Sequence, residues 1–302
     1  MSYILCLYVS ARGKVSEKME NRESKSRQIL LIRCSDKPGI IHAITGLLLQ
    51  TGCNIVSNHE FVEPMDSIFF MRTEFFGLSP ENELLSQIYA LLPKDAEIKI
   101  YQEKRQKVVL FATKESHCLG DLLLRHRSGE LDIDIPCVLS NHRELQSLVE
   151  DLHLPFHFIG HEGLTRETHE SQILQFLGTF SFDYIVLAKY MRILSENFVT
   201  KFPEKIVNIH HSFLPAFVGA SPYKQAYERG VKLIGATAHF VTSSLDEGPI
   251  LAQDVVPVDH SFTKDKLVLN GRDIEKVVLA RAIRFVLEHR VIVWKNKTVI
   301  FR

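Results

Sequence analysis

Two side chains on one short strand could act together on a reacting carbonyl group. Residues 206–215 (IVNIHHSFLP) start with β-branched residues, which favour a pleated backbone, and end at Pro215. Side chains alternate along a strand, so Asn208 and His210 should point to the same face. An amide can donate a hydrogen bond to an oxyanion, and an imidazole can move a proton. The pair therefore predicts a reaction centre where this strand ends.

His210 needs a neighbour that sets its tautomer or its charge, and Asp246 is the predicted partner. Asp246 lies in the segment 242–248 (TSSLDEG), where Gly248 gives the backbone freedom to fold the loop inward. A carboxylate favours the charged form of an imidazole and can also orient a water molecule. Asp is common in turns, so a purely turn-forming role for Asp246 is the alternative.

A metal site at His210 and His211 is a second interpretation of the same stretch. Neighbouring strand residues point to opposite faces, so the two rings cannot readily bind one ion. The sequence contains no H-E-x-x-H motif and no cluster of His and carboxylates at ligand spacing. We therefore expect no metal and no other cofactor. His239 lies among apolar strand residues and is expected to be a hydrogen-bonded supporting residue, not the proton donor.

The composition is that of an ordinary globular protein. Of the 302 residues, 45% are hydrophobic and 24% are charged, and this length predicts about two domains. Lys+Arg and Asp+Glu both number 36, which gives no electrostatic reason to expect nucleic acid or a membrane as partner. The five cysteines form no C-x-x-C pair, which favours a reducing, cytoplasmic environment. Residues 1–26 are expected to be a disordered extension outside the fold, and residues 1–18 would be absent if translation begins at Met19.

The segment 27–102 predicts a small ferredoxin-like domain. Its expected elements alternate as strand, helix, strand, strand, helix and strand, at 28–34, 40–50, 53–62, 67–76, 81–92 and 97–101. This β-α-β-β-α-β order is the ferredoxin-like plan. Together with Asp36-Lys37-Pro38-Gly39 between the first strand and helix, the order resembles the ACT domain family of regulatory modules.

That resemblance implies a regulatory domain with an amino-acid effector near Asp36, Pro38 and Gly39. ACT domains usually pair through their sheets, so a homo-oligomer, either a dimer or a tetramer, is expected. Two local interpretations compete at the turn. Gly39 could simply permit the tight turn, and Asp36 could simply cap the helix.

The segment 107–302 predicts an α/β domain with a doubly wound, mostly parallel sheet. Apolar runs such as 108–111 and 184–188 are typical of buried parallel strands, and they alternate with helical patterns. Further strands are expected at 133–139, 156–159, 206–209, 232–241 and 249–258, and a closing hairpin around Asn296. Helices are expected at 119–127, 144–152, 171–177, 221–229 and 263–288. Ligands of such sheets bind beyond the carboxyl ends of the strands.

Three separated motifs in this domain together resemble the folate-dependent formyltransferase superfamily. They are Asn208-Ile209-His210 followed by Leu214-Pro215, then His239-Phe240-Val241, then Asp246-Glu247-Gly248. The resemblance implies that Asn208 and His210 act at the formyl carbon and that Asp246 positions a water molecule or relays protons. It also implies a substrate site formed by the backbone of Met191, Arg192, Ile193 and Leu194, which would bind the pterin ring, and by His239 and Gly248.

Two features help to choose among members of that superfamily. The loop 112–117 contains no glycine and carries Glu115, so a phosphate cradle for a ribonucleotide acceptor is not expected. Formylation of initiator tRNA would call for a basic extra domain, and with zero net charge over the 302 residues this activity is not expected. With the ACT-like segment in front and the stretch 208–217, the chain resembles the formyltetrahydrofolate deformylase family. This implies hydrolysis of 10-formyltetrahydrofolate to tetrahydrofolate and formate, which supplies formate for purine biosynthesis and balances one-carbon folate pools.

Two other functions remain open from the sequence. A formyltransferase that uses an amine acceptor would need the same residues at the formyl carbon. A non-catalytic folate or amino-acid sensor would bind its ligand without turnover. The complete set of Asn208, His210 and Asp246 argues against the sensor.

Overall fold

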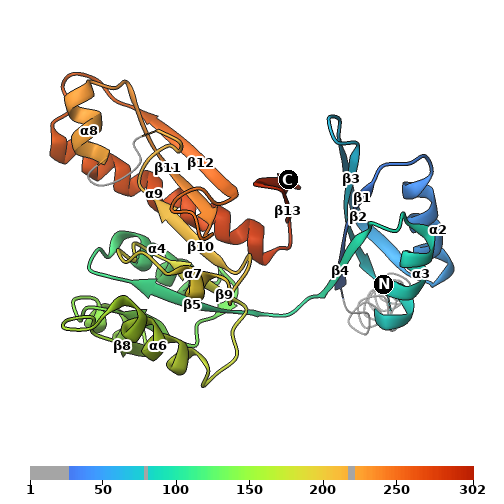
Figure 1. Cartoon of the computed structure of the whole chain (residues 1–302), viewed down its shortest axis with the longest axis horizontal. Helices are drawn as coiled ribbons and strands as arrows, with labels where there is room; N and C mark the ends of the chain where they lie inside the picture. Colours follow the sequence, from blue (N-terminus) through green and yellow to red (C-terminus); the bar gives the residue numbers. More distant parts are fainter. Residues whose placement is uncertain (1–26, 78–80, 217–221) are drawn as a thin grey trace, which may run out of the picture. The chain divides into compact units, whose positions relative to one another are not determined.

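The chain folds into two units that divide near Arg105. The computed structural model describes residues 27–77, 81–216 and 222–302, and each unit is considered by itself (Figure 1). The predicted extension 1–26 and the predicted helix start at Ser221 lie outside the described residues. Within the described part of the chain, no helix has the length and apolarity that crossing a membrane requires.

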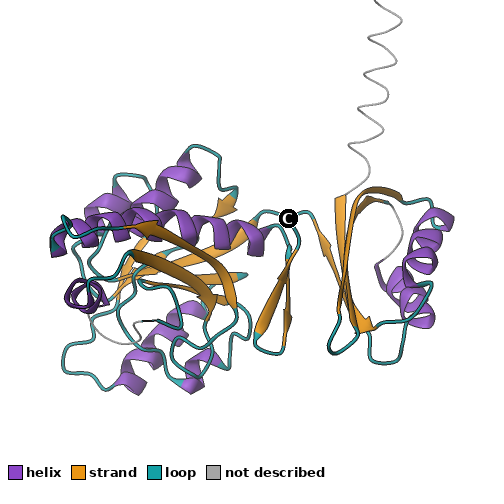
Figure 2. Ribbon diagram, turned by 90° about the horizontal axis from the view of Figure 1, so that it is seen from above, coloured by secondary structure: helices purple, strands orange, loops and turns teal. Residues whose placement is uncertain are grey.

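The first unit has the predicted ferredoxin-like plan. Its elements are β1 (Arg27–Ser35), α2 (Ile40–Gln50), β2 (Asn54–Glu63), β3 (Ile68–Phe76), α3 (Glu81–Leu91) and β4 (Glu97–Gln102). The strands form an antiparallel sheet in the order β2-β3-β1-β4. Both helices cover one face of this sheet (Figure 2) and bury a core that includes Leu30, Ile32, Ile44, Met71 and Ile88.

The turn before α2 depends on Gly39. Its φ of 91° lies in the left-handed region, which L side chains rarely adopt, so glycine permits this turn. Gly39 is itself the N-cap residue and no side chain caps the helix, so the predicted capping role of Asp36 is wrong. The backbone amide of Asp36 instead donates to the carbonyl oxygen of Ser67 at 2.8 Å. Asp36 and Pro38 are exposed.

The second unit is built on the predicted, mostly parallel sheet. Its strands are β5 (Gln106–Ala112), β6 (Ile133–Asp134), β7 (Val138–Ser140), β8 (Phe156–Phe158), β9 (Tyr184–Leu187), β10 (Ile206–His210), β11 (Leu233–Phe240) and β12 (Ile250–Pro257). The order is β12-β11-β10-β9-β5-β7-β8, with β6 paired to β5. Strands β11 and β12 are antiparallel to their neighbours and the others are parallel. The predicted closing hairpin is confirmed as β13 (Val291–Trp294) and β14 (Lys297–Ile300).

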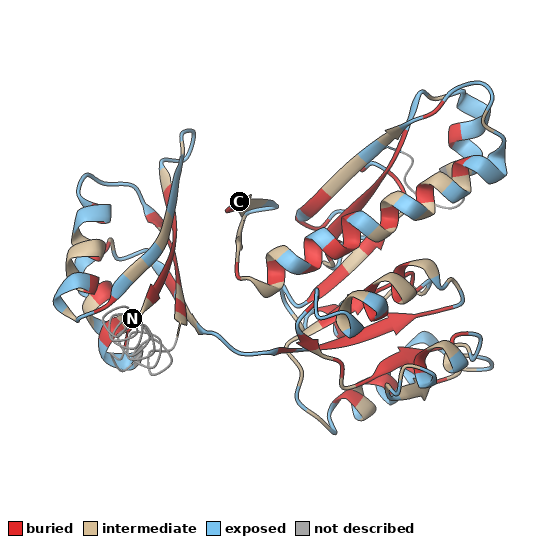
Figure 3. Ribbon diagram, turned by 180° about the vertical axis from the view of Figure 1, so that it is seen from behind, coloured by how far each residue is buried: buried red, intermediate tan, exposed pale blue. Residues whose placement is uncertain are grey.

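Helices cover both faces of this sheet, as the doubly wound prediction requires (Figure 2). They are α4 (His117–Arg127), α5 (Gln146–Glu150), α6 (Arg166–Leu177), α7 (Glu196–Val199), α8 (Pro222–Arg229) and α9 (Lys264–Leu287). Alternate residues of β5 serve the two faces: Val108 and Leu110 belong to the core with α4 and α9, while Val109 and Phe111 belong to the core with α6 and α7. Figure 3 shows the central strands β5, β9 and β10 as mostly buried.

Several predicted boundaries differ from the structure, and two of the differences have clear local reasons. Helix α6 begins at Arg166, earlier than predicted, because the side chain of Thr165 accepts a hydrogen bond from the amide of Thr168 and caps it. Helix α4 likewise begins earlier, and α5 is shorter than predicted. The expected strand 133–139 is divided into β6 and β7 around Pro136, which cannot donate a ladder hydrogen bond.

Candidate active site

A cavity of about 500 Å³ lies at the ends of β9 and β10, a volume typical of small-molecule sites. Asn208, Ile209 and His210 all border it. Val207 and Ile209 pack into the core with α4 and α9, so Asn208 and His210 share the other face of β10, as predicted. The loop 242–246 forms another wall of the cavity.

Asp246 lies against His210 within this cavity. Its Oδ2 is 3.2 Å from Nδ1 of His210, so Nδ1–H donates to the carboxylate. The other ring nitrogen of His210, Nε2, is buried and has no hydrogen-bond partner in the described protein. His210 itself is only 5% exposed. A substrate in the cavity is therefore the natural partner for Nε2.

His239 fixes the orientation of Asn208. The Nδ1 atom of His239 is 2.8 Å from the carbonyl oxygen of Phe240, which can only accept, so Nδ1 carries the proton. In the neutral ring Nε2 is then an acceptor, and the amide nitrogen of Asn208 lies 3.3 Å from it. An amide nitrogen has two protons, so the second remains for a ligand in the cavity. The expected supporting position of His239 agrees with this geometry.

The same arrangement keeps Asp246 ionised. Burial by itself raises the pKa of Asp246, but the hydrogen bond from His210 is the largest of the effects that lower it, and the net result is a pKa well below the usual range. The Oδ1 atom of Asp246 is 3.6 Å from Nε2 of His239. At neutral pH the site therefore holds a carboxylate that can accept a proton or orient a water molecule.

The loop reaches His210 by folding back over the sheet. Strand β11 ends beside the start of β10, because Phe240 is the register partner of Val207. The backbone of Asp246 is left-handed, with a φ of 57°, which Asp tolerates better than most residues. A Cβ on Gly248 would lie 1.7 Å from the carbonyl oxygen of Phe240, so only glycine lets the loop pack this closely.

Two predictions for Gly248 meet this geometry differently. The loop folds inward as predicted, and because the φ of Gly248 is not positive, close packing is what requires glycine there. Gly248 is not among the described residues that line the cavity, and its predicted contact with substrate stays a prediction.

The segment 191–194 also lines the cavity, as its predicted role requires. Met191, Arg192, Ile193 and Leu194 all line it, and the side chains of Met191 and Ile193 are more than half exposed, at 58% and 53%. Exposed apolar side chains around a cavity suit a flat, partly apolar ligand.

The backbone of this segment is held by a short chain of hydrogen bonds. The amide of Met191 donates to the hydroxyl of Thr113 at 2.9 Å, and that hydroxyl donates to Asn141 at 3.0 Å. The side-chain amide of Asn141 in turn donates to Nδ1 of His161 at 3.2 Å. The residues that follow β5, β7 and β8 thus position the segment, although sequence reasoning assigned them no such role.

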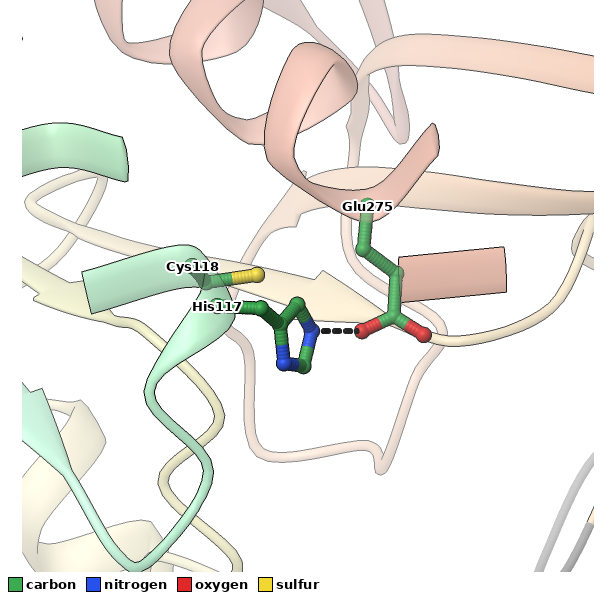
Figure 4. Close-up of side chains that lie close together, drawn as sticks. All are labelled: His117, Cys118 and Glu275. Atoms are coloured by element: carbon green, nitrogen blue, oxygen red, sulfur yellow. Dashed lines mark hydrogen bonds and ion pairs between the residues drawn. The ribbon is translucent and has the colours of Figure 1, made fainter. Parts of the chain in front are cut away.

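Sequence reasoning also missed a buried junction beside the cavity. Glu275, which is 0% exposed, accepts hydrogen bonds from His117 Nε2 at 2.7 Å and from the hydroxyl of Tyr223 at 2.5 Å, and its Oε2 lies 3.3 Å from Lys189 Nζ. Figure 4 shows His117 and Glu275 facing each other with Cys118 alongside. A carboxylate on the apolar stripe of a long helix was the signal that could have revealed it.

Three of these groups are close enough together to be considered as metal ligands. Donor atoms of His117, Cys118 and Glu275 lie within 4.8 Å of one another. Burial raises the pKa of the Cys118 thiol, which disfavours the thiolate that a metal would need. Glu275 already carries three protein partners, among them the cation of Lys189. The junction therefore has the character of an ion-pair network.

His211 supplies a test of this buried environment. Burial and then the charge of Lys189 lower the pKa of His211 from 6.5 to about 4. Between these values the unfolded chain binds a proton that the folded protein does not, so stability is lost as the pH falls. This single group should remove up to about 3 kcal/mol of unfolding free energy on going from neutral pH to pH 4.

Urea unfolding of wild type and His211→Gln between pH 4 and 7 measures that contribution. We expect the free energy of unfolding to fall more steeply with acidification in the wild type than in His211→Gln. Equal slopes for the two proteins would contradict the assignment.

Comparison with known proteins now places the chain in a family. Residues 106–283 match the family model described as formyl transferase. The chain is 49% identical to a formyltetrahydrofolate deformylase of Escherichia coli, covering 92% of this chain and 99% of that protein. It is 43% identical to one of Bacillus subtilis, covering 95% and 97% of the two chains.

A solved structure agrees with these sequence relatives. The crystal structure of a formyltetrahydrofolate deformylase from Pseudomonas syringae superposes with a TM-score of 0.88 at 38% identity, covering 97% of this chain and 100% of the other. The match therefore includes both units. With this coverage and identity, the chain belongs to the formyltetrahydrofolate deformylase family, within the formyl transferases.

Proposed function

We propose that the protein hydrolyses 10-formyltetrahydrofolate to tetrahydrofolate and formate. The observation that carries the proposal is the ionised Asp246 held 3.2 Å from His210 in a cavity that Asn208 also lines. A base, a proton carrier and an oxyanion donor converge on one point, which is what acyl transfer to water needs. The relatives named as formyltetrahydrofolate deformylases supply the identity of the substrate.

The reaction follows from the positions of these three groups. Asp246 orients a water molecule and accepts one of its protons as the water oxygen attacks the formyl carbon, which gives a tetrahedral oxyanion. The free amide proton of Asn208 and Nε2–H of protonated His210 donate to that oxyanion. When the bond between the formyl carbon and N10 breaks, His210 delivers a proton to N10. The products are tetrahydrofolate and formate, and no metal or other cofactor is needed for any of these steps.

The folate would be held by the segment 191–194. Backbone groups there, anchored through Thr113, can hydrogen-bond the pterin ring, and the apolar side chains of Met191 and Ile193 can cover its faces. In this orientation the formyl group would lie beside Asn208 and His210.

One assay tests the proposed function. The protein is incubated with 10-formyltetrahydrofolate in buffer without any amine, and formate and tetrahydrofolate are measured. Hydrolysis predicts equal amounts of both products at a catalytic rate. Formate that is formed only after an amine is added would indicate a transferase, and binding without turnover would indicate a sensor.

Regulation and assembly belong to the same proposal. An amino acid would bind at the turn of Asp36, Pro38 and Gly39 in an ACT-like first unit, and the protein would act as a homo-oligomer in the cytoplasm. The exposed turn and the ferredoxin-like plan of the unit support this assignment.

A further inference from the structure

Lys189 is a buried cation in the cavity wall that the hydrolytic steps do not use. It lines the cavity together with Asn208 and His210, although it is only 5% exposed. Its backbone has a φ of 62°, in the left-handed region that residues other than glycine seldom occupy. A long charged side chain that is both buried and in this conformation must be held in place by its surroundings.

Glu275 provides that hold. Burial by itself raises the pKa of Glu275, but the hydrogen bond with His117, the charge of Lys189 and the hydrogen bond with Tyr223 lower it to about 2. Glu275 is therefore ionised at neutral pH, and its Oε2 lies 3.3 Å from the Lys189 ammonium. His117, Tyr223 and Glu275 come from α4, α8 and α9, and Lys189 comes from the segment after β9. Glu275 is therefore held by groups on three other parts of the fold.

Within the cavity, the positive charge of Lys189 has a larger electrostatic effect than the negative charge of Glu275. Lys189 is among the described residues that line the cavity and Glu275 is not. His211, another lining residue, reports the result: after burial, the charge of Lys189 has the largest effect on its pKa and outweighs the opposing effect of Glu275. A second positive charge beside Lys189 is therefore disfavoured, whereas a charge on His210 is offset by its contact with Asp246.

We propose that Lys189, anchored by Glu275, is a specificity-determining residue that restricts the formyl acceptor to water. This inference rests on the proposed hydrolytic function. Small aliphatic amines are ammonium ions near neutral pH, so an amine acceptor would enter as a cation beside a fixed ammonium. Like-charge repulsion from the buried ammonium disfavours its entry, whereas neutral water enters freely.

The reaction that Lys189 prevents is balanced and simple. The neutral nitrogen of a primary amine would attack the formyl carbon, and the bond from that carbon to N10 would break. One proton would pass from the amine nitrogen to N10, giving an N-formyl amine and tetrahydrofolate. It needs no additional reactant, so its product can be measured directly beside formate.

Lys189→Met tests the inference with methylamine as the acceptor. Wild type and variant are incubated with 10-formyltetrahydrofolate and a series of methylamine concentrations, and formate and N-methylformamide are quantified by mass spectrometry against a protein-free blank. We expect formate as essentially the sole product of the wild type. The share of N-methylformamide among the products should be at least about tenfold higher for Lys189→Met than for the wild type. Each tenfold change in this partition corresponds to about 1.4 kcal/mol.

Three further variants make the outcome decisive. Lys189→Met/Glu275→Gln removes both charges and should show the same amide product. This double variant replaces Lys189→Met in the test if the single variant does not fold because Glu275 is left unpaired. Lys189→Arg retains the charge and should retain formate as the sole product. Lys201→Met, which changes an exposed lysine of the same unit, should behave as wild type.

The results separate this inference from the proposed function. Formate without amide from both Lys189→Met and the double variant would overturn the role of Lys189, as would amide from Lys189→Arg. A wild type that forms amide would overturn it too. A wild type that releases no formate in buffer alone would instead overturn the proposed hydrolysis.

Discussion

Asp246→Asn is expected to reduce kcat for formate release about a hundred- to ten-thousand-fold, the range that removal of a general base produces. Asn has the shape of Asp but no negative charge, so it can neither accept the proton of the attacking water nor pair with protonated His210. It also tolerates the left-handed backbone at this position, where φ is 57°. The variant should therefore fold and bind folate while turnover is lost.

Glu247→Gln is the matched control for this change. It removes one carboxylate from the same loop, but Glu247 is exposed and is not among the described residues that line the cavity. Its rate of formate release should stay within about twofold of wild type, as for most exposed substitutions. If Asp246→Asn retained more than about a tenth of the wild-type rate, a loss of less than 1.4 kcal/mol, Asp246 would not be the base.

The local part of the site could be predicted from the sequence. Alternation along a strand is a property of the backbone alone, and it placed Asn208 and His210 on one face before any fold was known. The contact of Asp246 with His210 does not follow from a local property of the backbone. Strand β11 ends beside the start of β10, and the contact exists because the loop folds back, which depends on close packing of Gly248 against Phe240. Spacing alone could not reveal this, and the family motif supplied it.

The junction around Glu275 could not be predicted for a related reason. Its partners His117, Lys189 and Tyr223 are far apart in the sequence and meet only when four elements pack. Each would ordinarily be interpreted as a solvated loop or helix residue. Similarly, Asp36 was a reasonable candidate for a helix cap, but Gly39 occupies the N-cap position and leaves no side chain to cap α2.

His210→Ala is expected to lower kcat about a hundred- to thousand-fold, as the loss of an oxyanion donor commonly does. The substitution removes both the Nε2 group that faces the cavity and the donor to Asp246. Because the segment 191–194 would still bind the pterin, KM should change much less than kcat, which is the signature of an interaction made mainly in the transition state.

Added imidazole distinguishes a chemical role of His210 from a structural one. His210→Ala leaves an imidazole-sized space beside an ionised Asp246, so protonated imidazole can bind there, donate one hydrogen bond to the carboxylate and donate the other to the oxyanion. We expect imidazole to restore part of the lost kcat in His210→Ala and to leave Asp246→Asn unaffected. His260→Ala, at an exposed position of the same unit, should keep the wild-type rate without imidazole. A KM effect alone, with kcat unchanged, would mean that His210 binds substrate and does not take part in bond cleavage.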